Sequence, residues 1–188
     1  AQAMILDHGY AGVSVDQLIS SLGLTKGAFF HHFKSKQELA RTLIQRYSDE
    51  GVHLFRDNLA RAKKLSGDPL QQFLIFIGLY EELFEGLTEP YPGCLLASYV
   101  MEMQQFDEDM RRIINVEFEL SRSELTTLIN EISEKYPPRS TIDAVSLADG
   151  FMAVFEGAFI LSKSLQEANI TALQLRHYKN YIELLFRH

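Results

Sequence analysis

The sequence contains a single cysteine, Cys94, and no tryptophan. One thiol cannot form an internal disulfide framework, and such sparse cysteine usage suits a reducing compartment. Long apolar runs are also missing, because the longest, residues 73–80, is interrupted by Gly78 and falls short of the roughly 18 residues that a membrane span needs. We therefore expect a cytoplasmic protein with no membrane segment, and we find no signal peptide pattern.

The residue patterns of the common enzyme classes are missing too. We find no nucleophile–base pairing, no cluster of metal-ligand residues and no glycine-rich phosphate loop. The sequence thus predicts a protein that is not an enzyme and needs no metal or cofactor. Strand-like alternation and internal repeats are absent as well, which favours an all-α fold. With 188 residues, 46% of them apolar, the chain can build one core, or a small domain joined to a larger one.

Charge is distributed unevenly along the chain. The formal net charge of −7 argues at first against a nucleic-acid partner. Residues 1–47, however, hold five Lys or Arg residues and three acids, a net charge of +2, so the remainder carries −9. A small cationic segment on an acidic body is compatible with DNA binding by the N-terminal part alone.

Apolar spacing and capping residues predict a succession of helices. Ser66-Gly67-Asp68-Pro69 is a clear break, in which Asp68 caps the next helix and Pro69 takes its first position. Gly51 lies inside a long predicted helix, and we expect a bend there. The predicted helices cover residues 3–8, 14–22, 26–32, 36–64, 69–87, 94–105, 107–134, 141–165 and 171–186.

Residues 14–36, SVDQLISSLGLTKGAFFHHFKSK, are organised as two short helices around a glycine turn. Ser14 is a natural N-cap, Gly23 can adopt the left-handed conformation that ends a helix, and Thr25 caps the next one. We expect Leu22 to join the buried face of the first helix and Leu24 to fix the turn to the core. This order is typical of a helix-turn-helix, whose second helix enters the major groove of DNA.

The second of these helices has a small and basic leading end. Gly27 and Ala28 would let it approach DNA closely, and Lys36 stands where the following helix begins, beside a helix N-terminus suited to phosphate. Phe30 either packs on the sugar-phosphate backbone or completes the core. The candidate DNA-binding residues are Ser14, Thr25, Lys26, Gly27, Ala28, Phe30, His31, His32 and Lys36.

The run SVDQLISSLGLTKGAFFHHFKSKQEL, residues 14–39, resembles the DNA-binding segment of the tetracycline-repressor (TetR) family of bacterial transcriptional regulators. Phe30 departs from the family pattern, which usually has a tyrosine whose hydroxyl reaches a phosphate. The rest of the chain matches in length and helical layout only. A basic arm precedes the first helix in that family, and the abrupt start at Ala1 leads us to expect that such an arm is missing here.

The resemblance implies two domains. Residues 1–47 would be the DNA-binding domain, and residues 48–188 a helical domain for dimerisation and effector binding. Aromatic and sulfur-containing side chains of the middle helices would line a pocket for a small, apolar or aromatic effector, although each taken alone is better explained as core. The candidate pocket residues are Phe73, Phe76, Tyr80, Phe84, Cys94, Tyr99, Met103, Phe118, Phe151, Phe155 and Glu156.

The two C-terminal helices carry more apolar surface than one core requires, which indicates a partner surface. Two such pairs, one from each subunit, would form a four-helix bundle between subunits, as in the resembled family. The candidate dimer residues are Leu147, Phe151, Val154, Ala158, Leu161, Tyr178, Ile182 and Leu185.

The sequence thus predicts a homodimeric, ligand-responsive transcriptional repressor that a small effector releases from a palindromic operator in double-stranded DNA. Two alternatives remain. The chain could be a protein-binding adaptor that kept the fold without DNA affinity, or a thiol-based sensor of electrophiles acting through Cys94, since a helix N-terminus depresses a thiol pKa. Cys94 taken alone is better explained as a small buried residue.

Overall fold

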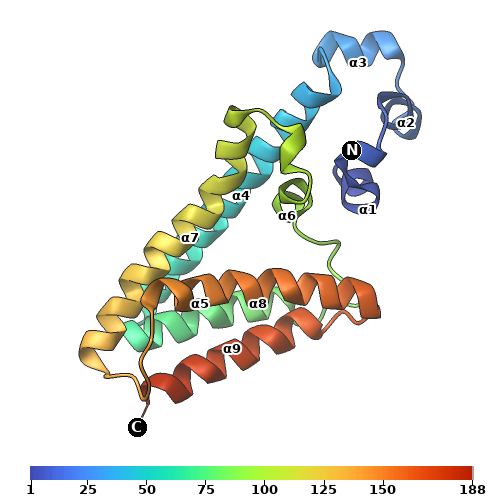
Figure 1. The fold of residues 1–188 in the computed structure, drawn as a ribbon. Helices are drawn as coiled ribbons and strands as arrows, with labels where there is room; N and C mark the ends of the chain where they lie inside the picture. Colours follow the sequence, from blue (N-terminus) through green and yellow to red (C-terminus); the bar gives the residue numbers. More distant parts are fainter. Residues whose placement is uncertain (188) are drawn as a thin grey trace. The chain divides into compact units, whose positions relative to one another are not determined.

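The computed structural model describes residues 1–187, which form nine α-helices and one short 3-10 helix without any strand (Figure 1). The all-helical fold predicted from the sequence is confirmed. The chain forms two compact units, and each is assembled from two separate segments. Unit 1 comprises residues 1–51 and 92–117, and unit 2 comprises residues 52–91 and the part of the chain that follows residue 117.

Unit 1 begins with three short helices, α1 (Gln2–Gly12), α2 (Val15–Ser21) and α3 (Lys26–His32), at the blue end of the ribbon in Figure 1. Its second segment contributes α6 (Leu95–Val100) and the 3-10 helix η1 (Met103–Gln105). The single helix predicted for residues 94–105 is therefore wrong, because the α-helix ends at Val100. Within unit 1, α1 packs against α6, so a segment from the middle of the chain supports the N-terminal helices.

The long helix α4 (Lys36–Leu65) starts in unit 1 and continues into unit 2. It runs through Gly51 as one continuous helix, so the glycine does not interrupt it. A Cβ at this position would overlap the carboxylate of Glu117, the flexible end of a side chain from α7 (Glu108–Lys135). Gly51 therefore makes room for a side chain of the neighbouring helix.

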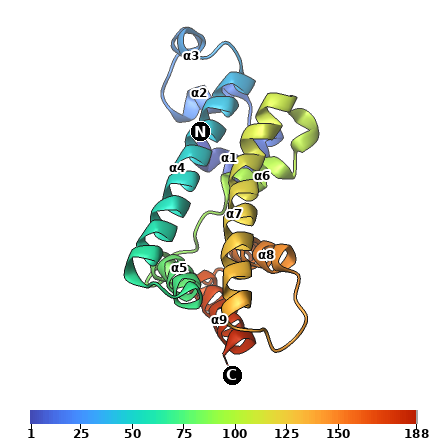
Figure 2. The same cartoon turned by 90° about the vertical axis from the view of Figure 1, so that its left-hand side faces the viewer.

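Unit 2 contains α5 (Pro69–Phe84), α8 (Ala144–Leu165) and α9 (Ile170–Phe186), which lie alongside one another in Figures 1 and 2. Helix α9 packs against both α5 and α8. The predicted extension of α5 to Leu87 is wrong, since the helix ends at Phe84 before a left-handed Gly86. The interior is largely aromatic, and Phe76, Phe151 and Tyr178 are all buried there.

Asp68 joins the start of α5 to the C-terminal end of α7. As predicted, it caps α5, accepting a 2.9 Å hydrogen bond from the Gln71 N–H. Its other carboxylate oxygen accepts hydrogen bonds from Lys135 Nζ at 2.7 Å and Tyr136 Oη at 2.5 Å. Partial burial alone would raise the pKa of Asp68, but the hydrogen bonds and the Lys135 charge outweigh it and lower the pKa from 3.8 to about 2.

Replacing Asp68 with asparagine is expected to destabilise the protein by about 1–2 kcal/mol at pH 7, a value that allows for solvent screening at this partly open corner. Asparagine keeps the helix cap but loses the charge. Because the native pKa is depressed, the contribution is complete above pH 4 and disappears as the pH falls to 2. Urea denaturation of both proteins between pH 7 and pH 2 measures the difference, and a gap that persisted at pH 2 would contradict this assignment.

Candidate nucleic-acid interface

The first helix of the predicted helix-turn-helix is held by a reciprocal cap. The Ser14 hydroxyl accepts a hydrogen bond from the Gln17 N–H at 3.2 Å, and the Gln17 side chain accepts one from the Ser14 N–H at 2.8 Å. This capping box satisfies two backbone donors at the helix start. The N-cap predicted at Ser14 is confirmed, and the side chain stays exposed beside the cap.

The turn between α2 and α3 has the predicted left-handed glycine, with φ of +64° at Gly23. The Leu24 N–H donates to the Ile19 carbonyl oxygen at 3.0 Å and closes the turn. Leu22 and Leu24 are both exposed, so the expectation that they reach the core is wrong. Helix α2 ends at Ser21, and the two leucines flank a surface turn, while Leu18 and Ile19 alone bury its inner face.

Helix α3 spans the predicted residues and begins at the predicted cap. The Thr25 hydroxyl accepts a 3.2 Å hydrogen bond from the Ala28 N–H. Phe29 is buried and holds the helix to the core of unit 1, with Phe33 half-buried beside it. The rest of the helix faces outward, with Lys26, Gly27, Phe30, His31 and His32 exposed and Ala28 half-buried.

Gly27 is not required by packing inside the protein. A Cβ built at this position would meet only the Thr25 hydroxyl oxygen, at 3.9 Å, which is ordinary contact. Glycine inside a helix nevertheless costs about 1 kcal/mol relative to alanine. A small residue that the protein itself does not need leaves the leading end of α3 open to close approach from outside.

Lys26 forms an ion pair with Asp16 of α2, with Nζ 2.8 Å from a carboxylate oxygen. Both side chains are mostly exposed, so the pair contributes little to stability. The ammonium group can exchange this partner for a phosphate at small energetic cost. Lys26 therefore remains available as a contact for an anionic ligand.

Lys36 occupies a different environment from the open surface expected of a phosphate contact. Its ammonium group donates a hydrogen bond to the Tyr10 carbonyl oxygen and lies 4.1 Å from the centroid of the Tyr10 ring. Burial lowers the pKa of Lys36, although the nearby Glu102 carboxylate acts in the opposite direction. The cation is thus already bound inside unit 1, and contact with a phosphate would require it to leave Tyr10.

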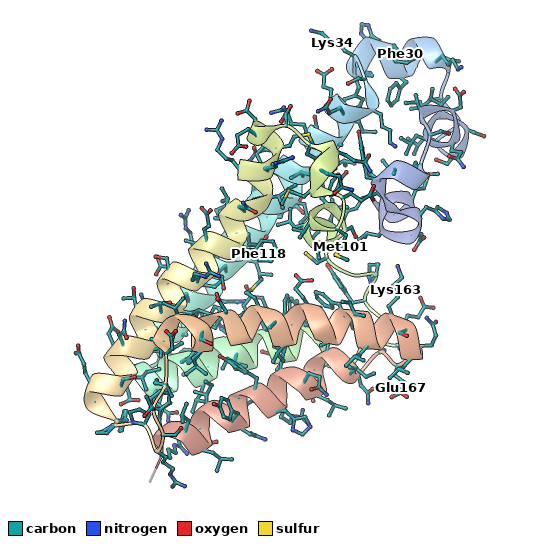
Figure 3. All side chains as sticks on the ribbon, viewed as in Figure 1. Phe30, Lys34, Met101, Phe118, Lys163 and Glu167 are labelled. Atoms are coloured by element: carbon teal, nitrogen blue, oxygen red, sulfur yellow. The ribbon has the colours of Figure 1, made fainter. Side chains whose placement is uncertain are left out.

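Phe30 and the two histidines complete the exposed side of α3. Phe30 is 51% exposed and meets Phe29 edge-on at 5.2 Å between ring centroids. The rings of His31 and His32 lie 5.1 Å apart. Phe30 on α3 and Lys34 in the turn after it lie at the same end of unit 1 (Figure 3). Within residues 1–187, no group of three potential metal ligands comes together.

The predicted effector residues divide between the two units. Cys94, Tyr99 and Met103 belong to unit 1, where the Cys94 sulfur caps α6 by accepting the Ala97 N–H at 3.4 Å. The other pocket residues belong to unit 2, and six of these form a continuous aromatic cluster with neighbouring centroids 5.2–6.5 Å apart. These six are Phe73, Phe76, Tyr80, Phe84, Phe151 and Phe155. Phe118 and Glu156 are half-buried.

Most residues predicted to contact a second subunit are buried in their own subunit instead. Five of them, Phe151, Ala158, Tyr178, Ile182 and Leu185, are covered within unit 2. Phe151 packs against the Phe76, Tyr80 and Tyr178 rings, and the Tyr178 hydroxyl donates to the Leu147 carbonyl oxygen at 2.6 Å. The most apolar stripes of α8 and α9 therefore join these helices to α5 and to each other. Leu147 and Val154 are half-buried, and Leu161 alone of the eight is exposed.

Several large apolar side chains of α8 and α9 remain exposed, and we refer to them together as the uncovered apolar surface of α8 and α9. Its exposed members are Val145, Ile160, Leu161, Leu165, Leu173, Tyr181 and Leu184. Helix α8 is long and apolar enough for a membrane span by length and composition alone, yet only 28% of its most apolar window is buried within the chain. A protein partner that covers the exposed side of the helix would explain this composition and exposure as well as a membrane would.

Sequence reasoning did not identify Glu102. Its carboxylate accepts hydrogen bonds from the backbone N–H groups of Tyr10 at 2.6 Å and Ala11 at 2.8 Å. These hydrogen bonds join residues about ninety positions apart in the sequence. A single glutamate belongs to no motif from which such a contact could be predicted. Gly9, with φ of +75°, was the available signal, because it breaks α1 immediately before the two N–H groups.

A capped helix, a left-handed glycine turn and a second helix with an exposed small and basic leading end define a helix-turn-helix DNA-binding protein. Residues 1–43 match the family model described as bacterial regulatory proteins, tetR family. The N-terminal segment is therefore similar to the DNA-binding segment of this family of transcriptional regulators.

Relatives and solved structures agree with this placement. The chain is 26% identical over 161 residues to the transcriptional regulator AcuR of Cereibacter sphaeroides, covering 85% of this chain and 71% of AcuR. It is 23% identical over 160 residues to the transcriptional repressor DhaR of a Mycobacterium species, covering 85% of this chain and 77% of DhaR. The solved structure of a TetR-family regulator from Agrobacterium tumefaciens has the same fold, with a TM-score of 0.74 and 24% sequence identity. The match covers 98% of this chain and 93% of that regulator.

Proposed function

We propose that this protein is a homodimeric transcriptional repressor that binds a palindromic operator through α3 and is released by a small apolar or aromatic effector. The observation that carries the DNA-binding part is the leading end of α3, where Gly27 is small without any internal reason to be small. Thr25, Lys26, His31 and His32 supply hydrogen-bonding or charged groups around it. We propose repression, rather than activation, because the relative DhaR is a transcriptional repressor.

Two features of unit 2 support the other parts of the proposal. The aromatic cluster around Phe76, Tyr80 and Phe155 offers the kind of wall that an aromatic effector would contact, and Glu156 on α8 supplies an acid beside it in sequence. The uncovered apolar surface of α8 and α9 supplies the dimer contact, and a two-fold pair of α3 helices would match a palindrome. We also propose that the protein is cytoplasmic and has no enzymatic activity.

The first test is fluorescence anisotropy with a labelled duplex taken from upstream of the protein's own gene. A random duplex serves as competitor, and two salt concentrations separate phosphate attraction from sequence recognition. We expect tight binding that resists the competitor, with two subunits per site. Equal binding to both duplexes at both salts, followed by failure of a genome-wide DNA selection, would overturn the proposal.

Replacing Gly27 with leucine is expected to move stability and DNA binding in opposite directions. The free energy of unfolding should rise by about 0.5–1 kcal/mol, because leucine is the better helix former and has room. Operator affinity should fall by about tenfold or more, because the side chain blocks the approach of α3.

The matched control is Ala60→Leu, which adds a larger side chain on the exposed part of α4 away from the proposed interface. This variant should leave operator affinity unchanged. If Gly27→Leu bound the operator as tightly as the wild type, α3 would not be the DNA-contacting helix.

The two alternatives make different predictions in the same assay. An adaptor without DNA affinity is favoured by the net charge of −7 and by the engagement of Lys36 with Tyr10, and it would bind neither duplex even at low salt. A thiol-based sensor would lose operator affinity on oxidation, and Cys94→Ser would abolish that response. The half-buried Cys94 thiol at the α6 cap keeps the second alternative open.

A further inference from the structure

Helix α1 breaks shortly before its end. Gly9 has φ of +75° and ψ of 161°, far from helical values, and only glycine adopts this conformation without strain. The break interrupts the regular hydrogen-bond ladder and turns the N–H groups of the next residues toward a new acceptor. Two adjacent backbone donors that point the same way form a natural site for a carboxylate.

The acceptor is a side chain from the other segment of unit 1. Glu102, which lies between α6 and η1, places one carboxylate oxygen 2.6 Å from the Tyr10 nitrogen and the other 2.8 Å from the Ala11 nitrogen. Gln105 Nε2 donates a third hydrogen bond to the same carboxylate at 2.9 Å. A Cβ at residue 9 would lie 2.9 Å from Glu102 Oε1, so the approach of the carboxylate is a second reason for glycine there.

Tyr10 is held through its ring and its carbonyl oxygen as well as through its N–H group. Its ring packs between Tyr99 and Phe106, with centroid distances of 5.7 and 5.0 Å, and its carbonyl oxygen accepts the Lys36 hydrogen bond. Tyr99 and Phe106 flank Glu102 in the sequence, so one short segment supplies both the apolar socket and the carboxylate. Lys36 is the first residue of α4, the helix that follows α3.

We propose that Glu102 is a positioning residue for DNA recognition: its carboxylate fixes the broken end of α1, and through Tyr10 the start of α4, so that α3 is held in the orientation that reads the operator. We call this arrangement, Glu102 with Tyr10, Ala11 and Lys36, the Glu102 clamp. This inference rests on the proposed function. It adds Glu102 to the residues that determine DNA recognition, although Glu102 itself contacts no DNA.

The clamp is an electrostatic contact as well as a set of hydrogen bonds. A carboxylate that accepts several N–H bonds holds them more strongly than a neutral amide can, because charged acceptors form shorter and stronger hydrogen bonds. Glu102 also raises the pKa of Tyr10, after burial, and favours the charged form of Lys36. Removing the charge while keeping the shape should therefore loosen α1 without opening a cavity.

The test compares Glu102→Gln with the wild type in the full chain. Glu108→Gln is the matched control, because it removes one negative charge from an exposed position at the start of α7. The control accounts for the general gain in DNA affinity that follows the loss of any acid. Circular dichroism confirms that each variant keeps the wild-type helix content before binding is measured.

The first readout needs no DNA. Amide hydrogen exchange followed by NMR should show the Tyr10 and Ala11 amides exchanging about tenfold faster in Glu102→Gln and unchanged in Glu108→Gln. The second readout is the ratio of operator affinity to random-duplex affinity, which should fall about tenfold in Glu102→Gln only. A purely structural loss would lower the active fraction for both duplexes equally and leave this ratio unchanged.

The two readouts separate the inference from the function on which it rests. If the wild type prefers no duplex, the proposed function fails, and the positioning role fails with it, while the amide exchange still decides whether Glu102 holds α1. If the wild type binds its operator but Glu102→Gln has the same exchange rates and the same affinity ratio, the Glu102 clamp is overturned. Faster exchange with an unchanged ratio would also overturn it, because α1 would then be loosened without effect on recognition.

Discussion

Replacing Phe29 with alanine is expected to destabilise unit 1 by about 3–5 kcal/mol and to abolish operator binding. Phe29 is 4% exposed and is the buried residue that joins α3 to the core, with the Phe33 ring 5.7 Å away. A small group of short helices has few other contacts with which to compensate. Urea denaturation followed by circular dichroism measures the loss, and anisotropy on the operator measures binding.

Phe30→Ala is the control, because it is the same substitution one residue further along the same helix. Phe30 is 51% exposed, so its removal should change stability by less than about 1 kcal/mol. If Phe30 packs on the sugar-phosphate backbone, its loss weakens binding to all duplexes alike. Equal stability losses for the two variants would contradict the burial on which this prediction depends.

Glutamate substitutions at Ile160 and at Leu184 are expected to convert the proposed dimer to a monomer and to lower operator affinity by about 100-fold or more. These side chains are 70% and 65% exposed and belong to the uncovered apolar surface of α8 and α9. A buried, unpaired carboxylate strongly disfavours such a contact, and one recognition helix alone loses the gain from binding two half-sites together. Sedimentation velocity measures the mass of each variant.

Leu83→Glu provides the comparison, because Leu83 is 50% exposed and belongs to α5 rather than to α8 or α9. This variant should remain dimeric and keep its operator affinity. A wild-type protein that sediments as a monomer at micromolar concentration would contradict the dimer itself. A Leu83→Glu variant that became monomeric would instead move the interface to α5.

The helix-turn-helix could be predicted almost residue by residue because its signals are local. Ser14, Gly23 and Thr25 act within one turn of their own positions, through caps and a left-handed backbone, and these contacts need no knowledge of the rest of the chain. The same reasoning located Asp68 as a cap. It could not show that Lys135 and Tyr136 share that carboxylate, because they meet it only after folding.

The features that could not be predicted concern residues whose partners are distant in sequence. The position of Lys36 suggested a phosphate contact, but nothing nearby reveals that Tyr10 would bind its ammonium group. At Gly51 the low helix propensity of glycine suggested a bend, and the sequence could not show that Glu117 lies beside it. Phe151 and Ile182 lie on strongly amphipathic helices, and periodicity identifies a buried face without saying whether the same subunit or a partner covers it.

The division of unit 1 between two segments has a consequence for its synthesis on the ribosome. Residues 1–51 leave the ribosome first, and about forty residues of unit 2 follow before residues 92–117 can join them. During that interval Tyr10 has neither the Glu102 carboxylate nor the Tyr99 and Phe106 rings that later enclose it. The N-terminal helices of a nascent chain therefore wait, incompletely packed, for a partner segment, and at that stage they are exposed to proteases and chaperones. Stalled chains that end before Pro92 should accordingly be cleaved within α1 far faster than chains that extend past Glu117.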